Sequence, residues 1–168
     1  MATGLLVFDI LIFAGTLWLG LYLIGRDRRN PRLCLSGLGL VSYALGWALD
    51  IAGRAAPTLT LERTLADARW PFYSLPALFW TGALVYLLPD DVPLRARLGA
   101  IWRYGVVPVA ALCYLAGEIG GLPLDMTADG PRLSVANLVV SIVVLAPMLL
   151  AAGLVWRAIR SAPPRNAG

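Results

Sequence analysis

Apolar and polar residues are segregated along the chain into long blocks, with no short-period alternation. Five blocks consist almost entirely of apolar or small residues, and they cover residues 4–25, 33–53, 70–88, 104–122 and 133–156. Each is close to the roughly 20 residues that a helix needs to cross the hydrocarbon core of a bilayer. A membrane β-barrel would instead show alternating segments of about ten residues. The pattern therefore predicts an all-α membrane protein, a bundle of five transmembrane helices that satisfy their own backbone groups.

The segments between the blocks are too short to hold a soluble domain, so we expect one transmembrane domain over residues 1–160. After the second block, Pro57 and Thr58 break the helix, and the apolar spacing in TLERTLADARW predicts a short amphipathic helix on the membrane surface. The connection PDDVPLRARLGAIWR should be helical after Pro89, whereas LPLDMTADGPR is rich in turn residues. Residues 161–168 have the composition of a disordered cytoplasmic tail.

Arginine is distributed unequally between the two ends of the expected helices. Ten arginines lie on the side of the first and third connections and the C-terminal tail, and four lie on the other side. Because basic residues favour the cytoplasmic side, we expect the N-terminus outside and the C-terminus in the cytoplasm, in a bacterial inner membrane. The first block has no basic segment before it and is long for a signal peptide, so we expect an uncleaved anchor.

Small residues and prolines mark individual blocks. In the second block, small residues recur at every fourth position, which lets helix backbones approach closely and predicts a central helix. Pro76, Pro108 and Pro147 lie inside the third, fourth and fifth blocks. Each proline removes a backbone donor and tends to kink its helix.

Composition limits the possible chemistry. The hydrophobic share is 59% and the charged share 14%, well below the quarter or so that is usual in soluble domains. Lysine and histidine are absent, which excludes a retinal Schiff base, an imidazole metal ligand and a phospho-accepting histidine. Cys34 and Cys113 should lie at different depths, so we expect no disulfide between them. We expect no nucleic-acid partner, since the net charge of +4 reflects arginines at helix ends. We also expect no enzyme activity, cofactor or metal site, because the sequence contains no Walker loop, no paired cysteines, no HExxH and no Gly-x-Ser-x-Gly motif.

Three acidic residues fall inside the blocks, and all three are nearer the outer end. Asp9, Asp50 and Glu118 should therefore face the bundle interior or a wet cavity, as acids in membrane helices usually do. Arg54 follows Asp50 by four residues, a spacing at which helix side chains meet, and Arg69 is a second candidate counter-ion. Two interpretations are open: ion pairs at the membrane interface, or an outward-facing polar pocket that these five residues line.

Two runs, NPRLCLSGLGLVSYALGWALDIAG and RWPFYSLPALFWTGALVYLLP, carry a resemblance through Asn30-Pro31-Arg32, Trp70-Pro71 and the stretch from Pro76 to Trp80. They resemble the multi-span N-terminal sensor regions of bacterial histidine kinases and related signalling proteins, the seven-helix class. The chain departs from that class in having five expected helices and no kinase, cyclase or DNA-binding domain after them. The resemblance implies a sensory or scaffolding membrane module with its C-terminus inside, which would signal by binding a partner.

We therefore expect a non-enzymatic integral membrane protein, a sensor-like or accessory subunit. Besides the lipid bilayer, its partner would be another membrane protein or a second copy of the chain. The alternatives are a small transporter or ion-handling protein that uses the outer acids, and a membrane enzyme that acts on lipid at the outer face. An acid–arginine pocket open to the outside would favour these alternatives. A solid bundle with one exposed apolar or small-residue face would favour the accessory subunit.

Overall fold

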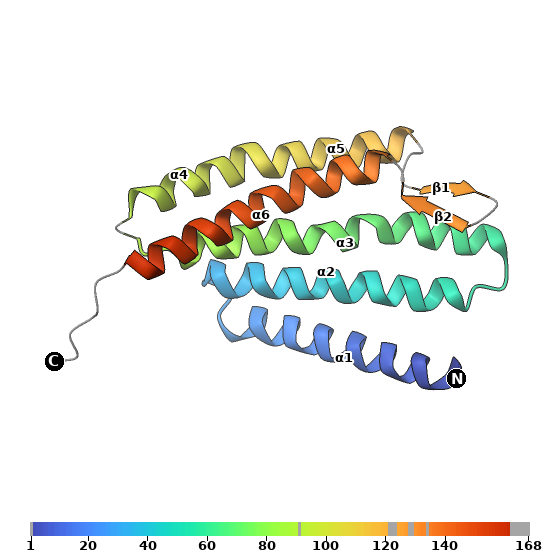
Figure 1. The fold of residues 1–168 in the computed structure, drawn as a ribbon. Helices are drawn as coiled ribbons and strands as arrows, with labels where there is room; N and C mark the ends of the chain where they lie inside the picture. Colours follow the sequence, from blue (N-terminus) through green and yellow to red (C-terminus); the bar gives the residue numbers. More distant parts are fainter. Residues whose placement is uncertain (1, 91, 121–123, 128–129, 134, 162–168) are drawn as a thin grey trace.

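The computed structural model describes residues 2–90, 92–120, 124–127, 130–133 and 135–161, so most of the expected tail lies outside the described residues. Five helical rods run back and forth along a common direction (Figure 1). They are α1 (Ala2–Arg26), α2 (Pro31–Arg54), α3 (Leu59–Leu87), the continuous rod of α4 (Pro93–Ile101), η1 (Trp102–Val106) and α5 (Val107–Gly120), and α6 (Val135–Ser161). The expectation of five long helices is confirmed. A short antiparallel hairpin of β1 (Leu124–Thr127) and β2 (Gly130–Leu133) joins α5 to α6, where the sequence indicated only turns.

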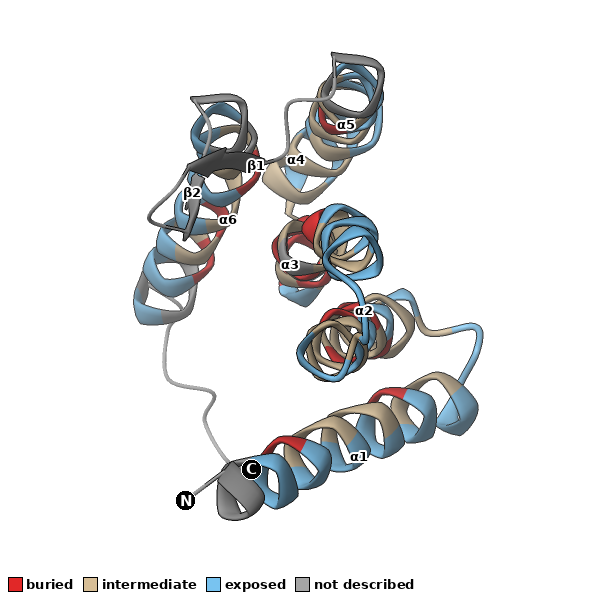
Figure 2. Cartoon of the chain, turned by 90° about the vertical axis from the view of Figure 1, so that its right-hand side faces the viewer, coloured by how far each residue is buried: buried red, intermediate tan, exposed pale blue. Residues whose placement is uncertain are grey.

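The helix α3 lies at the centre of the bundle (Figure 2). It packs against α2 on one side and against α6 and the α4–η1 segment on the other. In contrast, α1 lies at the edge and packs mainly against α2. The small residues of the second block predicted a central helix, and α2 does lie between α1 and α3, although α3 contacts more of the bundle.

Glycines set the distance between α1 and α2. A Cβ atom added at Gly20 would lie 2.9 Å from the carbonyl oxygen of Gly37, and one added at Gly37 would lie 2.6 Å from the carbonyl oxygen of Gly20. Real Cβ atoms do not approach an oxygen so closely, so the two backbones touch where neither residue has a side chain. This is the small-residue packing that the sequence of the second block indicated.

Two tryptophan rings pack directly over glycines of neighbouring elements, where the glycines leave room for them. The ring of Trp80 on α3 covers Gly39 of α2, and its Nε1 donates to the carbonyl oxygen of Ser36 at 3.4 Å. The ring of Trp102 on η1 covers Gly82 of α3, and its Nε1 donates to the carbonyl oxygen of Leu78 at 3.0 Å. Large rings in glycine notches with satisfied indole donors make these contacts close and specific.

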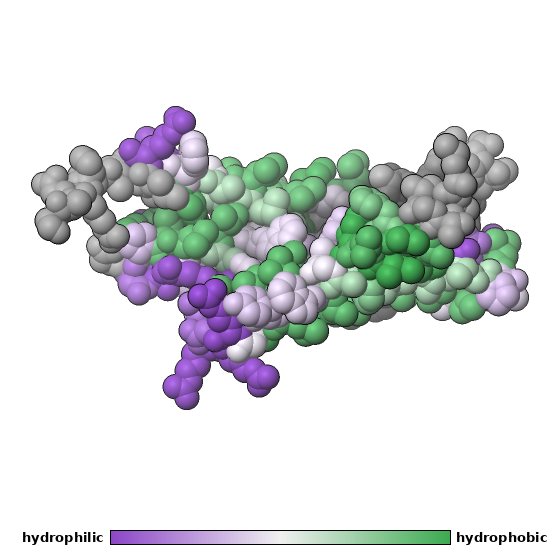
Figure 3. Space-filling view, turned by 90° about the horizontal axis from the view of Figure 1, so that it is seen from below, coloured by the Kyte–Doolittle hydropathy of each residue, from purple (hydrophilic) through white to green (hydrophobic). Residues whose placement is uncertain are grey.

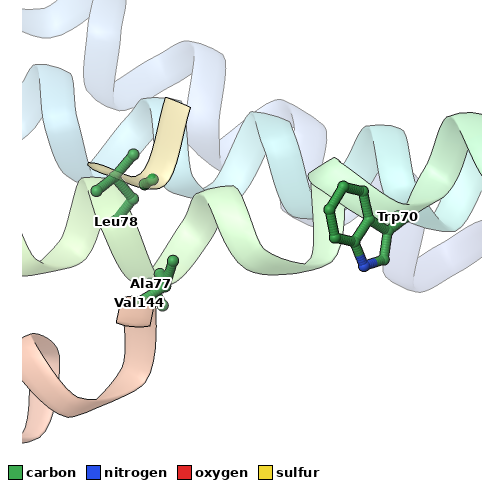
Figure 4. Close-up of a cluster of buried hydrophobic side chains, with 5 residues drawn as sticks. Trp70, Ala77, Leu78 and Val144 are labelled. Carbon is green, nitrogen blue, oxygen red and sulfur yellow. The ribbon is translucent and has the colours of Figure 1, made fainter. Parts of the chain in front are cut away.

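A cluster of buried apolar side chains joins the rods that surround α3 (Figure 4). Its members are Trp70, Ala77, Leu78, Ala110 and Val144, from α3, α5 and α6. Trp70 also packs edge-on against the ring of Tyr114 on α5, with ring centroids 5.3 Å apart. The cluster holds together three consecutive rods of the bundle.

The expected surface helix before the third block is not a separate element. The helix α3 begins at Leu59, after the Thr58 side chain accepts a hydrogen bond from the Leu61 amide at 3.3 Å, and continues without a break to Leu87. It includes Pro71 and Pro76, each of which removes one backbone hydrogen bond. Trp70 is buried and Arg69 pairs with Asp50 of α2, and these contacts hold the first turns of α3 in line with the rest.

The helical connection that the sequence predicted before the fourth block is present as α4, which continues into α5 through the π-helical segment η1. The π-helical turns lie just before Pro108. Pro108 has no amide hydrogen for the carbonyl of Tyr104, and its ring crowds that carbonyl. The wider π geometry gives this position more room, so the rod passes through the proline without breaking.

Three helical segments have the length and composition of membrane spans: Leu6–Arg26, Pro31–Arg54 and Pro93–Ala116. A shorter apolar segment, Ser141–Arg157, lies in α6. Large apolar side chains such as Leu11, Leu112 and Leu149 are exposed on α1, α5 and α6. Seen from below, the hydrophobic surface extends along the bundle, and hydrophilic side chains gather toward the end that holds the α1–α2 connection (Figure 3). Such extensive apolar surface is compatible with a membrane protein.

Candidate polar site at one end of the bundle

Four of the five polar residues singled out in the sequence meet at one end of α1, α2 and α3. Arg54 Nη2 lies 2.7 Å from Asp9 Oδ2 on α1 and 3.1 Å from Asp50 Oδ2 on α2. Arg69 on α3 donates from Nη1 to Asp50 Oδ1. The order Asp9–Arg54–Asp50–Arg69 thus links three helices, and we call these four residues the charge network.

Local sequence places each member. Asp50 and Arg54 are one helical turn apart at the end of α2, and Arg54 Nε also lies 3.5 Å from the carbonyl oxygen of Asp50. A basic residue in the last turn of a helix interacts favourably with the helix dipole. Asp9 lies between the exposed Phe8 and Ile10, yet it is buried because its side of α1 faces α2.

The members of the charge network differ in how far water reaches them. The Asp9 side chain is 8% exposed, those of Asp50 and Arg69 are 22% and 29% exposed, and that of Arg54 is 51% exposed. Two carboxylates and two guanidinium groups leave the network with no net charge. A buried carboxylate is tolerated only when it is paired, and Arg54 supplies that partner to Asp9 while remaining in contact with water.

A small cleft lies beside the charge network. It has a volume of about 90 Å³, and it lies between the ends of α2 and α3. Charged residues from both helices line it, namely Asp50, Arg54, Glu62, Arg63 and Arg69. Arginines outnumber acids in this lining, and three of the residues are among the five expected to line a polar pocket, namely Asp50, Arg54 and Arg69.

Glu118 belongs to α5, which lies on the far side of α3 from α1 (Figure 2). Its side chain lies outside the described residues. A pocket formed by Asp9, Asp50 and Glu118 together would need α5 beside α1, whereas the helix that contacts α1 most extensively is α2. The five candidate residues therefore do not form one cluster around α1.

The described residues hold no group of three or more His, Cys, Asp or Glu side chains that could bind a metal ion. Within the charge network, each carboxylate already contacts a guanidinium group. These ion pairs hold α1, α2 and α3 together at one end of the bundle. Cys34 and Cys113 are free thiols.

Sequence reasoning missed two polar contacts that need the tertiary structure. Inside the bundle, the Tyr114 hydroxyl on α5 donates to Ser74 Oγ on α3 at 2.6 Å, and Ser74 Oγ lies 3.3 Å from the carbonyl oxygen of Pro71. At the opposite end from the charge network, Arg103 Nη2 donates to the Tyr86 hydroxyl at 2.9 Å. Neither pair has a sequence spacing that would have indicated it.

Comparison of the chain with protein-family models, with curated proteins and with solved structures gives no match.

Proposed function

We propose that this chain is a five-helix integral membrane protein that acts without catalysis, as a sensor-like or accessory subunit, through a membrane protein partner or a second copy. In this proposal the N-terminus is outside and the C-terminus is in the cytoplasm of a bacterial cell. The distribution of arginine supports this orientation. The ends of α1 and α6 that carry Arg26 and Arg160 lie at the same end of the bundle as α4, which carries Arg95 (Figure 1).

The observation that carries the proposal is the position of α1. This helix packs mainly against α2, and its other sides expose large apolar residues that include Phe8, Leu11 and Trp18. At its outer end the Asp9–Arg54 pair connects it to the rest of the bundle. A helix with one principal neighbour and a wide apolar surface is suited to contact another membrane helix.

The charge network favours this proposal over an ion-handling protein. A cation site in a membrane needs carboxylates that face a wet cavity and are available to the ion. Asp9 and Asp50 instead contact Arg54, and Asp50 also contacts Arg69. The close Gly20–Gly37 contact and the tryptophan-filled notches leave α1, α2 and α3 packed as a solid unit.

Site-specific photo-crosslinking in the native membrane tests the proposal. A photoreactive residue would replace Leu11 or Trp18 on the exposed side of α1, and a matched probe would replace the equally exposed Leu112 on α5. We expect a discrete protein adduct from the α1 positions that is absent or of different size at Leu112. A doubled mass would identify a second copy as the partner. Adducts with lipid alone at all three positions would contradict the proposal.

A further inference from the structure

A second cleft, at the opposite end of the bundle, lies between the last turn of α3 and the α4–η1 segment. Its volume is about 230 Å³. The polar side chains that line it are Tyr86, Arg95, Arg103 and Tyr104, and Gly99 lines it without a side chain. We call it the basic cleft.

The two arginines of the basic cleft differ in their partners. Arg95 pairs with Asp90, which is 85% exposed, and its guanidinium carbon lies 5.3 Å from the ring centroid of Tyr86. Arg103 donates to the neutral Tyr86 hydroxyl, and the ion pairs found among the described residues do not include it. Within the described part of the chain, the cleft therefore carries an excess positive charge together with two phenol hydroxyls.

These groups have the chemistry of a phosphate site. A guanidinium group binds phosphate oxygens through two parallel N–H donors, and it is the preferred side chain for this role. Because Asp90 is exposed to water, a phosphate oxygen could replace its carboxylate at Arg95 at little cost. The hydroxyls of Tyr86 and Tyr104 add donors at the same opening.

The surroundings of the basic cleft are apolar. Tyr104 is 75% exposed, and Ile101 and Leu87 beside the opening are also exposed. Farther along the same rod, α5 also exposes Leu112 and Leu115. A positively charged opening on a rod that also exposes large apolar side chains suits a molecule with an anionic head and hydrocarbon chains.

We propose that the basic cleft binds the phosphate of an anionic phospholipid, with Arg103 as the main ligand and Arg95 and Tyr104 as supporting ligands. This inference depends on the membrane location proposed above. The acyl chains lie along the exposed face of α5, and the headgroup lies at the arginine-rich end of the bundle. Free inorganic phosphate would bind the same arginines but would not contact the exposed apolar side chains of α5.

Native mass spectrometry of the full chain in detergent, titrated with dioleoyl phosphatidylglycerol or dioleoyl phosphatidylcholine, tests the lipid site. A basic residue near a membrane surface changes the affinity for anionic lipid about fivefold. We therefore expect phosphatidylglycerol to bind more tightly than phosphatidylcholine, and Arg103→Gln to reduce its affinity about fivefold. Arg97→Gln is the matched control, since Arg97 is exposed on the same helix but does not line the cleft.

A second variant fills the basic cleft without changing its charge. A Cβ atom at Gly99 would meet Val85 Cγ1 at 3.9 Å, an ordinary contact, so Gly99→Leu can fold while placing a side chain in the opening. We expect Gly99→Leu to weaken phosphatidylglycerol binding and Arg103→Lys to retain part of it. Circular dichroism of each purified variant shows that a loss of lipid does not reflect unfolding.

Three outcomes would overturn the lipid site. They are equal affinity for the two lipids, a preference for phosphatidylglycerol that neither Arg103→Gln nor Gly99→Leu reduces, and displacement of phosphatidylglycerol by millimolar inorganic phosphate. The last would identify the free ion as the ligand. Flotation with phosphatidylcholine vesicles tests the membrane location separately from the lipid site. Protein that fails to float contradicts the membrane location itself, whereas protein that floats without a preference for phosphatidylglycerol contradicts only the lipid site.

Discussion

Arg54 Nη2, at the last residue of α2, lies 2.7 Å from Oδ2 of Asp9, a buried carboxylate on α1. The same nitrogen lies 3.1 Å from Asp50 Oδ2, so one guanidinium group serves two carboxylates on two helices. Since Arg54 is half exposed while Asp9 is buried, the arginine connects an interior charge to the surface. Loss of Arg54 should therefore affect α1 more than loss of an ordinary surface arginine.

Arg54→Gln should destabilise the bundle because it leaves Asp9 buried and without its partner. Breaking a fully buried pair costs about 3–5 kcal/mol, and we expect about 1–2 kcal/mol here because water reaches Arg54. Thermal unfolding in detergent measures the change, and Arg63→Gln on the exposed start of α3 is the control. The double variant Asp9→Asn with Arg54→Gln should recover part of the loss. Equal stability of Arg54→Gln and Arg63→Gln would contradict this prediction.

Asp50→Asn should also be destabilising, by about 1–2 kcal/mol, more than the 0–1 kcal/mol typical of a surface ion pair. The sequence offered Arg54 and Arg69 as candidate counter-ions, and in the structure both of them contact Asp50. Denaturation in detergent of Asp50→Asn beside Glu62→Gln, a nearby acid outside the charge network, tests this. A gain in stability from Asp50→Asn would mean that the acids repel one another, contrary to the pairing seen here.

Gly20→Ala and Gly37→Ala should each destabilise the α1–α2 contact, because the new methyl group would meet a carbonyl oxygen closer than 3 Å. Overpacking of this kind costs about 1–3 kcal/mol. Gly15→Ala in the same helix is a sharp control, since a Cβ atom there meets nothing within 4 Å. In a helix interior, alanine is favoured over glycine by about 0.5–1 kcal/mol, so Gly15→Ala should be neutral or stabilising. If all three variants had the same melting temperature, α1 and α2 would not be in close contact.

The proposed orientation predicts opposite compartments for the C-terminus and for the hairpin between α5 and α6. A reporter that is active only in the cytoplasm should be active when fused after Ser161 and inactive when inserted near Thr127. A reporter that is active only outside should give the reverse pattern. The reason is the split of ten arginines against four between the two ends. Activity of the outside reporter at the C-terminus would contradict the orientation.

The five helices could be predicted because each apolar block is long enough to be recognised without tertiary information. The Asp50–Arg54 pair could be predicted as well, since both residues belong to one helix and their spacing places them together. The Asp9–Arg54 contact depends on how α1 crosses α2, and that crossing follows from the Gly20–Gly37 contact. The sequence suggested that Asp9 had a partner but not which one.

Two errors have physical causes. The apolar spacing before the third block predicted a separate surface helix, whereas packing of Trp70 and pairing of Arg69 hold that segment in one continuous α3. The basic cleft was missed because Tyr86 and Arg103 come from different rods. Their contact depends on the turn between α3 and α4, which apolar periodicity does not describe.

The Asp9–Arg54 pair also orders the events of biosynthesis. Asp9 leaves the ribosome well before Arg54, because the whole of α2 separates the end of α1 from its partner. Until α2 has been translated, the first helix carries a carboxylate that no guanidinium group neutralises at that depth. In the proposed membrane location, a lone α1 would therefore enter lipid less readily than α1 paired with α2. Once α2 is made, Arg54 is available to Asp9, and the charge network is complete only when α3 brings Arg69 to Asp50.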